Sequence, residues 1–293
     1  MRPLVMKFGG ELLEDRSRLS TVVDAVRTIA ERSPLVVVHG GGKEIDAALK
    51  TAGIEKRQVD GLRITDAATL DVVVAVLAGT INTRFVAALN ANGVSAVGLT
   101  GADDHVGLSS VAPPHRAVDG QVVDLDRVGL PVQGTSTRLL ETLLERGFVP
   151  VLACIGTGAD GELFNVNADT LAGHIAARLR ASRLIIAGTT PGVLDAEGAT
   201  LPVLEASAVA ELVGAGTATA GMIAKLRACE HALGANVDDV VIVDGRDSAT
   251  LVQAATPGAD APTSATQVCR GTRAAGLIDR GAGAPGVIRT VTA

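Results

Sequence analysis

Short apolar runs alternate with amphipathic segments along most of the chain. Residues 3–8 and 35–38 predict buried strands, because each is a nearly continuous apolar run that stops at glycines. After the first run, apolar residues recur at helical spacing, at Leu19, Val22, Val23, Val26, Ile29 and Ala30. The chain therefore predicts repeated units of strand, turn and helix.

The same alternation continues to residue 243. Further strands are predicted at residues 94–99, 149–155, 184–187 and 240–243. Further helices are predicted from about residue 65 through 82 and beyond, and at residues 137–146, 170–179, 206–213 and 222–233. Thr65 and Asp66 offer an N-cap for the first of these helices. Residues 101–135 differ, since their glycines, prolines and alternating segments indicate short hairpins.

Alternating strands and helices predict an α/β fold with a central, mostly parallel sheet covered on both faces. Ligands of such sheets bind at the carboxyl ends of the strands. We expect two continuous lobes, residues 1–180 and 181–293, because no Pro/Ser-rich linker divides the chain. From Thr256 onward the sequence is irregular, apart from an edge strand predicted at residues 287–291.

Length and hydropathy limit the class of protein. A chain of 293 residues and 29.6 kDa can bury a sizeable core. Its longest apolar run, residues 72–79, is shorter than the roughly 20 residues that a membrane span needs. Gly9 and Gly10 interrupt the N-terminus before a signal-length apolar segment develops. We therefore expect a cytoplasmic protein without a membrane partner.

Charge and composition argue against several ligand classes. The net charge is −6 and aromatic residues make up 1%, so the sequence predicts no nucleic-acid partner. Cys154, Cys229 and Cys269 are far apart and odd in number, which favours buried thiols over disulfides or zinc. The five histidines show no H-x-x-x-H spacing, and no protein metal site is predicted.

Residues 156–161 match the dinucleotide-binding pattern G-x-G-x-x-G. That pattern requires a helix to open at the third glycine, whereas residues 162–165 look like the return strand of a hairpin. A second match at residues 281–286 follows no predicted strand. Both matches are therefore attributed to the high glycine content.

Two other glycine segments occur where a strand ends and a helix can begin. They are Lys7-Phe8-Gly9-Gly10 and His39-Gly40-Gly41-Gly42. Glycines there let backbone N–H groups approach phosphate oxygens at the positive end of the following helix. Tight strand-to-helix turns are the alternative explanation. Lys7 is either an edge charge or a lysine directed into a cleft.

Three polar residues, Asn165, Asn167 and Asp169, separate a predicted hairpin from a predicted helix. An Asx turn followed by an N-cap at Asp169 would explain them structurally. Their position after a strand also places them among candidate site residues.

Five motifs, taken in order, resemble the amino acid kinase superfamily, and most closely its N-acetyl-L-glutamate kinases of arginine biosynthesis. They are Lys7-Phe8-Gly9-Gly10, Val38-His39-Gly40-Gly41-Gly42, Gly61-Leu62-Arg63-Ile64-Thr65, Asn165-Val166-Asn167-Ala168-Asp169 and Gly221-Met222-Ile223-Ala224-Lys225. The resemblance spans residues 3–273. It implies a three-layer α/β sandwich whose N-terminal lobe binds the acyl amino acid and dimerises, and whose C-terminal lobe binds ATP.

The resemblance implies ATP-dependent phosphorylation of the γ-carboxylate of N-acetyl-L-glutamate. Lys7 and Lys225 would contact the transferring phosphoryl group from opposite sides, and Asp169 would hold both ammonium groups. Gly10 and Gly41 would donate backbone N–H groups to it.

The resemblance also implies which residues bind each substrate. Residues implied for N-acetylglutamate are Gly41, Gly42, Arg63, Asn165 and Asn167, with Arg63 on the α-carboxylate. Residues implied for ATP are Lys7, Gly9, Gly10, Thr189, Gly221, Met222 and Lys225. Mg²⁺ would be bound mainly through the phosphates.

Some positions depart from the family pattern. Relatives usually show Thr/Ser-Asp where this chain has Ala187-Gly188-Thr189-Thr190, and Ala224 replaces the usual proline before the second lysine. The histidine expected after Asp244-Gly245-Arg246 is missing. Two alternatives therefore stay open: a paralogue that phosphorylates another N-acyl acidic amino acid, and a non-catalytic amino-acid-binding regulatory protein of the same fold.

Arginine-inhibited members of this family resemble one another in an extra N-terminal helix that links dimers into a ring. Only six residues precede Lys7 here. We expect a homodimer, joined through apolar faces of the N-terminal lobe such as the helix containing Leu70, Val73, Val74 and Leu77, and no strong inhibition by arginine.

Overall fold

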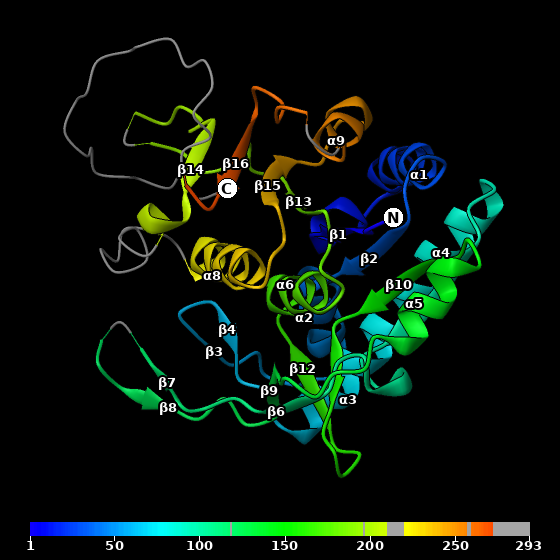
Figure 1. Cartoon of the computed structure of the whole chain (residues 1–293). Coiled ribbons are helices and arrows are strands. Elements are labelled where there is room, and N and C mark those ends of the chain that lie inside the picture. The colour runs from blue at the N-terminus through cyan, green and yellow to red at the C-terminus, as the bar shows by residue number, and fades with distance from the viewer. Residues whose placement is uncertain (118, 196, 210–219, 257–258, 272–293) are drawn as a thin grey trace.

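An eight-stranded sheet forms the centre of the computed structural model, which describes residues 1–117, 119–195, 197–209, 220–256 and 259–271 (Figure 1). The strand order is β14-β16-β15-β13-β1-β2-β10-β5, and every neighbouring pair is parallel except β15 with β16. The strands are β1 (Leu4–Phe8), β2 (Leu35–His39), β5 (Ala96–Thr100), β10 (Val149–Ala153), β13 (Arg183–Gly188), β14 (Val203–Glu205), β15 (Asp239–Asp244) and β16 (Ala265–Cys269). The predicted mostly parallel sheet is confirmed.

Helices cover both faces of this sheet, so the three-layer sandwich is also confirmed (Figure 1). One face carries α1 (Arg16–Ala30), α4 (Asn82–Ala91) and α9 (Ser248–Ala254), and the other carries α6 (Ala168–Arg178) and α8 (Ala220–Gly234). Further helices are α2 (Gly42–Thr51), α3 (Ala67–Val74), α5 (Arg138–Glu145), η1 (Gly10–Leu12) and η3 (Asp103–His105). Strands β1, β2, β10 and β13 are buried along their whole length, which explains their nearly continuous apolar pattern.

A second sheet contains the hairpin region. Its order is β11 (Ile155–Thr157), β12 (Leu163–Val166), β9 (Val128–Pro131) and β6 (Ser109–Val111). Two small hairpins accompany it, β3 (Gln58–Val59) with β4 (Leu62–Arg63) and β7 (His115–Arg116) with β8 (Val122–Val123). Since β11 and β12 pair antiparallel, residues 156–161 lie at the end of a hairpin strand and in its turn, and no dinucleotide-binding helix opens at the third glycine. The predicted helix at 206–213 runs into undescribed residues, and the predicted strand at 287–291 lies outside the described part of the chain.

The longest helical run, Ala67–Ala91, is also the most apolar one. It comprises α3, the π-helical segment η2 (Ala75–Ile81) and α4, and Asp66 caps it by accepting a hydrogen bond from Thr69. Its 25 residues and mean hydropathy of 1.8 would satisfy the length and composition of a membrane span, contrary to the expectation from residues 72–79. Within the described residues, however, one side of the run packs against β5, β10 and β12.

Packing of this helix limits which of its side chains could meet a second subunit. Leu70, Val73 and Leu77 are buried inside the protomer, against the sheet and its neighbouring helices, and Val74 is half-buried. Apolar positions that follow the sheet side of a helix are filled by the protein's own core. These three side chains are therefore unavailable to a second subunit.

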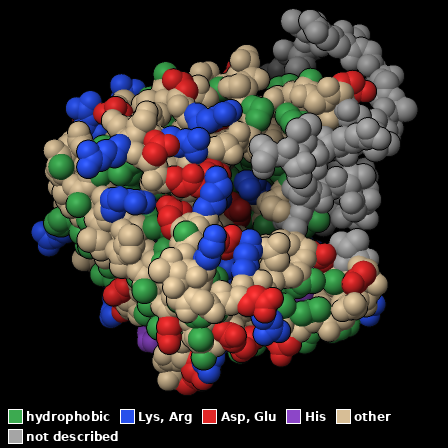
Figure 2. Space-filling view, turned by 180° about the vertical axis from the view of Figure 1, so that it is seen from behind, with side chains coloured by type: hydrophobic (Ala, Val, Ile, Leu, Met, Phe, Trp, Pro, Cys, Tyr) green, Lys and Arg blue, Asp and Glu red, His purple; other side chains and the backbone are tan. Residues whose placement is uncertain are grey.

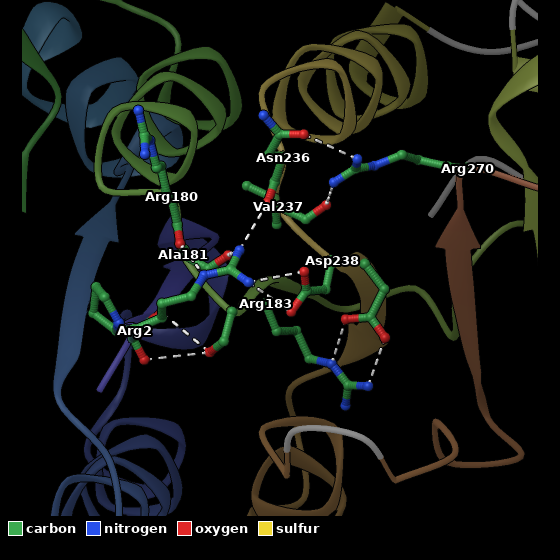
Figure 3. A network of polar contacts seen from close by, with 11 residues as sticks. Arg2, Arg180, Ala181, Arg183, Asn236, Val237, Asp238 and Arg270 are labelled. Atoms are coloured by element: carbon green, nitrogen blue, oxygen red, sulfur yellow. Dashed lines mark hydrogen bonds and ion pairs between the residues drawn. The ribbon is translucent and has the colours of Figure 1, made fainter.

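Arginine side chains tie the amino ends of the central strands together (Figure 3). Arg2 forms an ion pair with Asp238 at 2.9 Å and donates to the carbonyl oxygens of Arg180, Ala181 and Asn236. Arg183 is fully buried on β13 and binds both carboxylate oxygens of Asp239 on β15 at 2.7 Å. Because a buried charge is tolerated only when it is paired, this bidentate contact fixes β13 beside β15. The candidate ligand-binding residues lie at the opposite, carboxyl ends of these strands.

The thiols behave as predicted at two positions of three. Cys154 and Cys229 are buried, and burial raises the pKa of the Cys154 thiol to about 12. Cys269 at the end of β16 is only half-buried. Cys154 is therefore a neutral core residue at neutral pH.

His39 at the end of β2 is a neutral, fully buried histidine. Asn82 donates to its Nε2 at 3.0 Å, and its Nδ1 lies 3.3 Å from the carbonyl oxygen of Gly40. Burial lowers the pKa of His39 from 6.5 to about 4. His39 thus supports the glycine segment that follows it, without carrying charge.

The buried imidazole predicts acid sensitivity of folding. Between pH 6.5 and pH 4 the unfolded chain protonates His39 while the folded chain does not, so the free energy of unfolding falls as the pH falls. We expect this residue to account for up to about 3 kcal/mol of the loss. Urea unfolding of His39→Gln at pH 7 and pH 4.5 should show a shallower pH dependence than the parent protein, and the exposed His105→Gln should not. Equal losses in parent and His39→Gln would contradict this assignment.

Candidate active site

Two glycine segments meet at the carboxyl ends of the adjacent strands β1 and β2. A Cβ atom at Gly10 would lie 2.6 Å from Cα of Gly41, which no side chain could tolerate. The amide of Gly40 donates to the carbonyl oxygen of Phe8 at 3.2 Å and holds the two segments together. Glycine is therefore required at position 10 by backbone contact, and the two segments form one floor.

Two lysines and one carboxylate meet beside this floor. Nζ of Lys7 on β1 lies 2.9 Å from Oδ1 of Asp169 on α6, and Nζ of Lys225 on α8 lies 3.8 Å from Oδ2. The Lys7 and Asp169 side chains are each 7% exposed, while that of Lys225 is 18% exposed. The structure thus brings together three residues that are more than fifty positions apart in sequence.

Asp169 is positioned by the start of its helix. Asn167, and not Asp169, is the N-cap of α6: its side-chain oxygen accepts hydrogen bonds from the amides of Asp169 and Thr170. The alternative in which Asp169 caps the helix is therefore wrong. Asp169 stands in the first turn, where its carboxylate is free to face the lysines, and Ala168 packs near Gly40.

Charge pairing keeps these groups ionised despite their burial. Burial alone would raise the pKa of Asp169, but the positive charges of Lys7 and Lys225 outweigh it and hold that pKa below its usual value. Burial alone would lower the pKa of Lys7, but Asp169, with a smaller contribution from Glu11, raises it. Lys7, Asp169 and Lys225 together carry one net positive charge, which the nearby Glu11 partly offsets, and the two ammonium groups are suited to bind an anion.

Close packing between α6 and α8 sets the distance from Asp169 to Lys225. A Cβ atom at Gly173 would lie 2.9 Å from the carbonyl oxygen of Ala228 and 3.1 Å from its Cβ. One turn further on, the rings of His174 and His231 stack with centroids 5.8 Å apart. The sequence analysis missed this contact, because a lone glycine within a predicted helix gives no sign of what it faces.

A pocket of about 260 Å³ lies next to the glycine floor. Its lining residues are Glu11, Gly42, Lys43, Asp46, Lys56, Gln58, Gly61 and Arg63. Gly42 and Arg63 were predicted to bind substrate, and Arg63 extends into this pocket from β4 with a side chain that is 13% exposed. Asp46 and Lys56 were missed, since a charge on an amphipathic helix or in a loop resembles an ordinary solvated residue.

Asn165 and Asn167 do not line this pocket. Asn165 on β12 donates its side-chain amide to the hydroxyl of Thr65 at 3.0 Å, which joins the second sheet to the segment after Arg63. The oxygen of Asn167 is used by the helix cap. Both residues therefore shape the site in this structure by holding its walls.

The residues predicted to bind ATP stand on β1, at the end of β13 and at the start of α8. Gly9 follows β1, Thr189 directly follows β13, and Gly221 and Met222 stand in the first turn of α8. A Cβ atom at Gly9 would overlap the carboxylate of Glu11, which folds back over the glycine. Glu11 is a residue that the sequence analysis did not select, although it stands directly after Gly10.

The chemistry of this edge is phosphate chemistry. Backbone amides at glycines, a helix start and two lysines favour a polyanion, while the neighbouring pocket offers Arg63 to a carboxylate. Within the described part of the chain, no three His, Cys, Asp or Glu side chains are grouped as metal ligands.

Comparison with known proteins agrees with this geometry. Residues 2–244 match the sequence profile of the amino acid kinase family. The chain belongs to that family. A curated acetylglutamate kinase of Methanopyrus kandleri is 42% identical over 243 residues, covering 82% of this chain and 94% of the relative. Another, from Erythrobacter litoralis, is 40% identical and covers 84% of this chain and 83% of the relative.

Solved structures share the fold of the whole described chain. N-acetylglutamate synthase from Neisseria gonorrhoeae, complexed with coenzyme A and N-acetylglutamate, aligns with a TM-score of 0.76 at 23% identity. The alignment covers 92% of this chain and spans about 60% of that synthase. Carbamate kinase from Giardia lamblia aligns with a TM-score of 0.64 at 15% identity, covering 92% of this chain and 99% of that one. At these identities the likeness establishes the fold alone.

The contact between α6 and α8 yields a prediction. In Gly173→Ala, the added methyl group must push Ala228 outward by a few tenths of an ångström, which moves Lys225 away from Asp169. We expect kcat of the family's phosphotransfer reaction to fall by about tenfold, with a smaller change in KM. The control is Ala47→Gly on the outer side of α2, which should leave kcat unchanged. A Gly→Ala change at the exposed Gly53 is a poorer control, because its φ of +70° would strain the new side chain. Unaltered kcat in a folded Gly173→Ala protein would show that this contact does not position Lys225.

Proposed function

We propose that this protein is an ATP-dependent N-acetyl-L-glutamate kinase, which forms N-acetyl-L-glutamyl 5-phosphate in arginine biosynthesis. The observation that carries the proposal is the buried cluster of Lys7, Asp169 and Lys225 at the glycine floor, in a chain about 40% identical to curated acetylglutamate kinases. It supports phosphoryl transfer to a carboxylate.

The acceptor chemistry fits a site without a general base. The γ-carboxylate of the substrate is already ionised at neutral pH, so the obstacle is its repulsion by the triphosphate. Two unit charges about 4 Å apart repel by roughly 4 kcal/mol at an effective dielectric constant of 20. Lys7 and Lys225 offset this repulsion from opposite sides of the transferring phosphoryl group, and Gly10 and Gly41 donate backbone N–H groups. Asp169 keeps both ammonium groups in place and takes no proton.

The substrates divide between the two halves of the sheet edge. Gly41, Gly42, Arg63, Asn165 and Asn167 hold N-acetylglutamate, with Arg63 on the α-carboxylate, in the lobe of residues 1–180. ATP binds in the lobe of residues 181–293 together with the loop after β1. Its binding residues are Lys7, Gly9, Gly10, Thr189, Gly221, Met222 and Lys225.

The residues present fit a nucleoside triphosphate with Mg²⁺. Glycines at the ends of β1 and β2 bring backbone segments close together beside Lys7, where amides could meet phosphate oxygens once the Glu11 carboxylate moves off Gly9. Mg²⁺ prefers oxygen ligands and keeps several waters, and the phosphates supply most of those oxygens. When bound, the ion would supply neutralisation of phosphate charge. Lys7 and Lys225 complete that neutralisation from the protein side.

We further propose a cytoplasmic homodimer. The helical run Ala67–Ala91 is strongly apolar, yet only 39% of its most apolar window is buried within the protomer. Its outer side carries the exposed Ala75 and the half-buried Val72, Val74 and Ala78. Small and β-branched residues that one chain leaves uncovered can be buried by a symmetric second copy.

Assembly is tested by light scattering. The parent protein should have twice the chain mass of 29.6 kDa over a range of concentrations. Ala75→Glu, which places a charge opposite its own symmetry mate, should give the mass of one chain. Ala47→Glu on the exposed side of α2 is the control. A monomeric parent protein, or an Ala75→Glu protein that remains dimeric, would contradict this interface.

Activity is tested by ADP release with hydroxylamine trapping of the acyl phosphate. N-acetyl-L-glutamate should be turned over, and free glutamate, N-acetylaspartate and longer acyl homologues should be poorer substrates. Because the lysines act in the transition state, Lys7→Ala or Lys225→Ala should lower kcat by about 10²-fold or more, with a smaller effect on KM.

The other outcomes of this assay are informative. Preferred turnover of a different N-acyl acidic amino acid would identify a specialised paralogue. Binding of an amino acid without ATP binding, measured by calorimetry, would identify a non-catalytic regulatory protein. Lys50→Ala, which removes an exposed lysine at the end of α2, should leave kcat unchanged.

A further inference from the structure

Three charged side chains form a chain of contacts at the mouth of the 260 Å³ pocket. Asp46 on α2 accepts hydrogen bonds from Nη2 of Arg63, through Oδ1, and from Nζ of Lys56 at 2.7 Å, through Oδ2. Asp46 therefore stands between the two cations and contacts a different one with each oxygen. We call these three residues the mouth triad. Figure 2 shows such mixing of basic and acidic side chains across one face of the molecule.

Exposure increases along the triad from the pocket outward. The Arg63 side chain is 13% exposed, that of Asp46 is 34% exposed and that of Lys56 is 42% exposed. Nη1 of Arg63 is buried and has no hydrogen-bond partner among the described residues. Arg63 thus offers a donor to a ligand, while its other terminal nitrogen is held by Asp46.

Asp46 has a cost for the ligand that Arg63 is placed to bind. Without Lys56, Arg63 and Asp46 would form a pair with no net charge, and repulsion by Asp46 would offset part of the attraction of Arg63 for an arriving carboxylate. Lys56 changes the sum to one net positive charge. Burial raises the pKa of Asp46, but the hydrogen bonds from Lys56 and Arg63 outweigh it and lower that pKa, so the carboxylate stays ionised.

Stability alone does not account for this arrangement. An ion pair as exposed as that of Lys56 with Asp46 typically contributes little to folding. Lys56 is also one of only five lysines in a chain whose other cations are arginines. Its position on the pocket lining therefore points to ligand binding.

We propose that Lys56 is a positioning residue that neutralises Asp46, so that Arg63 presents net positive charge to the α-carboxylate of the substrate. Asp46 in turn orients the guanidinium group by holding Nη2. Lys56 acts through Asp46 and does not contact the substrate. This inference rests on the proposed function, since it takes the α-carboxylate to be the ligand of Arg63.

The test measures binding of N-acetyl-L-glutamate by calorimetry and its steady-state KM and kcat. Lys56→Ala should weaken binding and raise KM by about tenfold while kcat changes by less than about twofold, because the charge acts equally on ground and transition states. Raising the ionic strength should reduce this difference. Lys56→Arg should retain parent affinity. Lys50→Ala is the matched control and should have no effect.

A second substitution distinguishes neutralisation from direct contact. In Lys56→Ala combined with Asp46→Asn, the repelling charge is gone and the asparagine oxygen still accepts from Arg63, so affinity should return to within about threefold of the parent protein. The inference is overturned if Lys56→Ala binds normally, or if the double variant stays as weak as Lys56→Ala.

Failure of the proposed function would give a different pattern. Should the parent protein bind another N-acyl acidic amino acid in place of N-acetylglutamate, the proposed substrate is wrong, and the same variants with that ligand support or overturn the role of Lys56. A parent protein that binds no member of the substrate panel would overturn both.

Discussion

The site depends on one buried carboxylate that pairs with two lysines from distant parts of the sequence. Asp169 can remain ionised at 5% exposure only because Lys7 and Lys225 face it, and the two ammonium groups can lie near each other only because Asp169 separates them. The three positions therefore constrain one another. The rest of the fold must therefore hold β1, α6 and α8 at closely defined positions relative to one another.

Two close backbone contacts fix the relative positions of these elements. Gly10 meets Gly41 where β1 and β2 end, and Gly173 meets Ala228 where α6 crosses α8. In both places the absence of a side chain brings backbones closer than any other residue would allow. The arginine contacts at the amino ends of the strands, led by Arg183 with Asp239, fix the same sheet from the far side. Binding groups can then stand on short segments without being mobile.

Periodicity in the sequence was sufficient to predict the elements, the parallel sheet and the strand-end glycine segments. The reason is that β1, β2, β10 and β13 are buried on both faces and are therefore nearly continuous apolar runs. It could not predict partners across the fold. Asp169 was expected as a possible helix cap, but a capping residue and its neighbour two positions later look alike until Asn167 is seen to accept the amide hydrogen bonds. The helix containing Leu70, Val73 and Leu77 was expected at a subunit contact, yet these three side chains face the protein's own core. Apolar spacing identifies a buried face but not what buries it.

Charges at the pocket mouth were the least predictable part, and they show why. Lys56 stands in a loop, Asp46 lies on the polar side of an amphipathic helix, and each alone is an ordinary surface residue. Their meaning comes from distances that only the fold sets: Asp46 reaches both Lys56 and Arg63, so the number of positive charges that a substrate meets is one rather than zero or two. The deeper cluster has the same sum of charges, because its two lysines and one aspartate also leave a single positive charge. The two anionic ends of an acidic amino acid would thus each meet one net positive charge, held at a separation that the sheet edge determines.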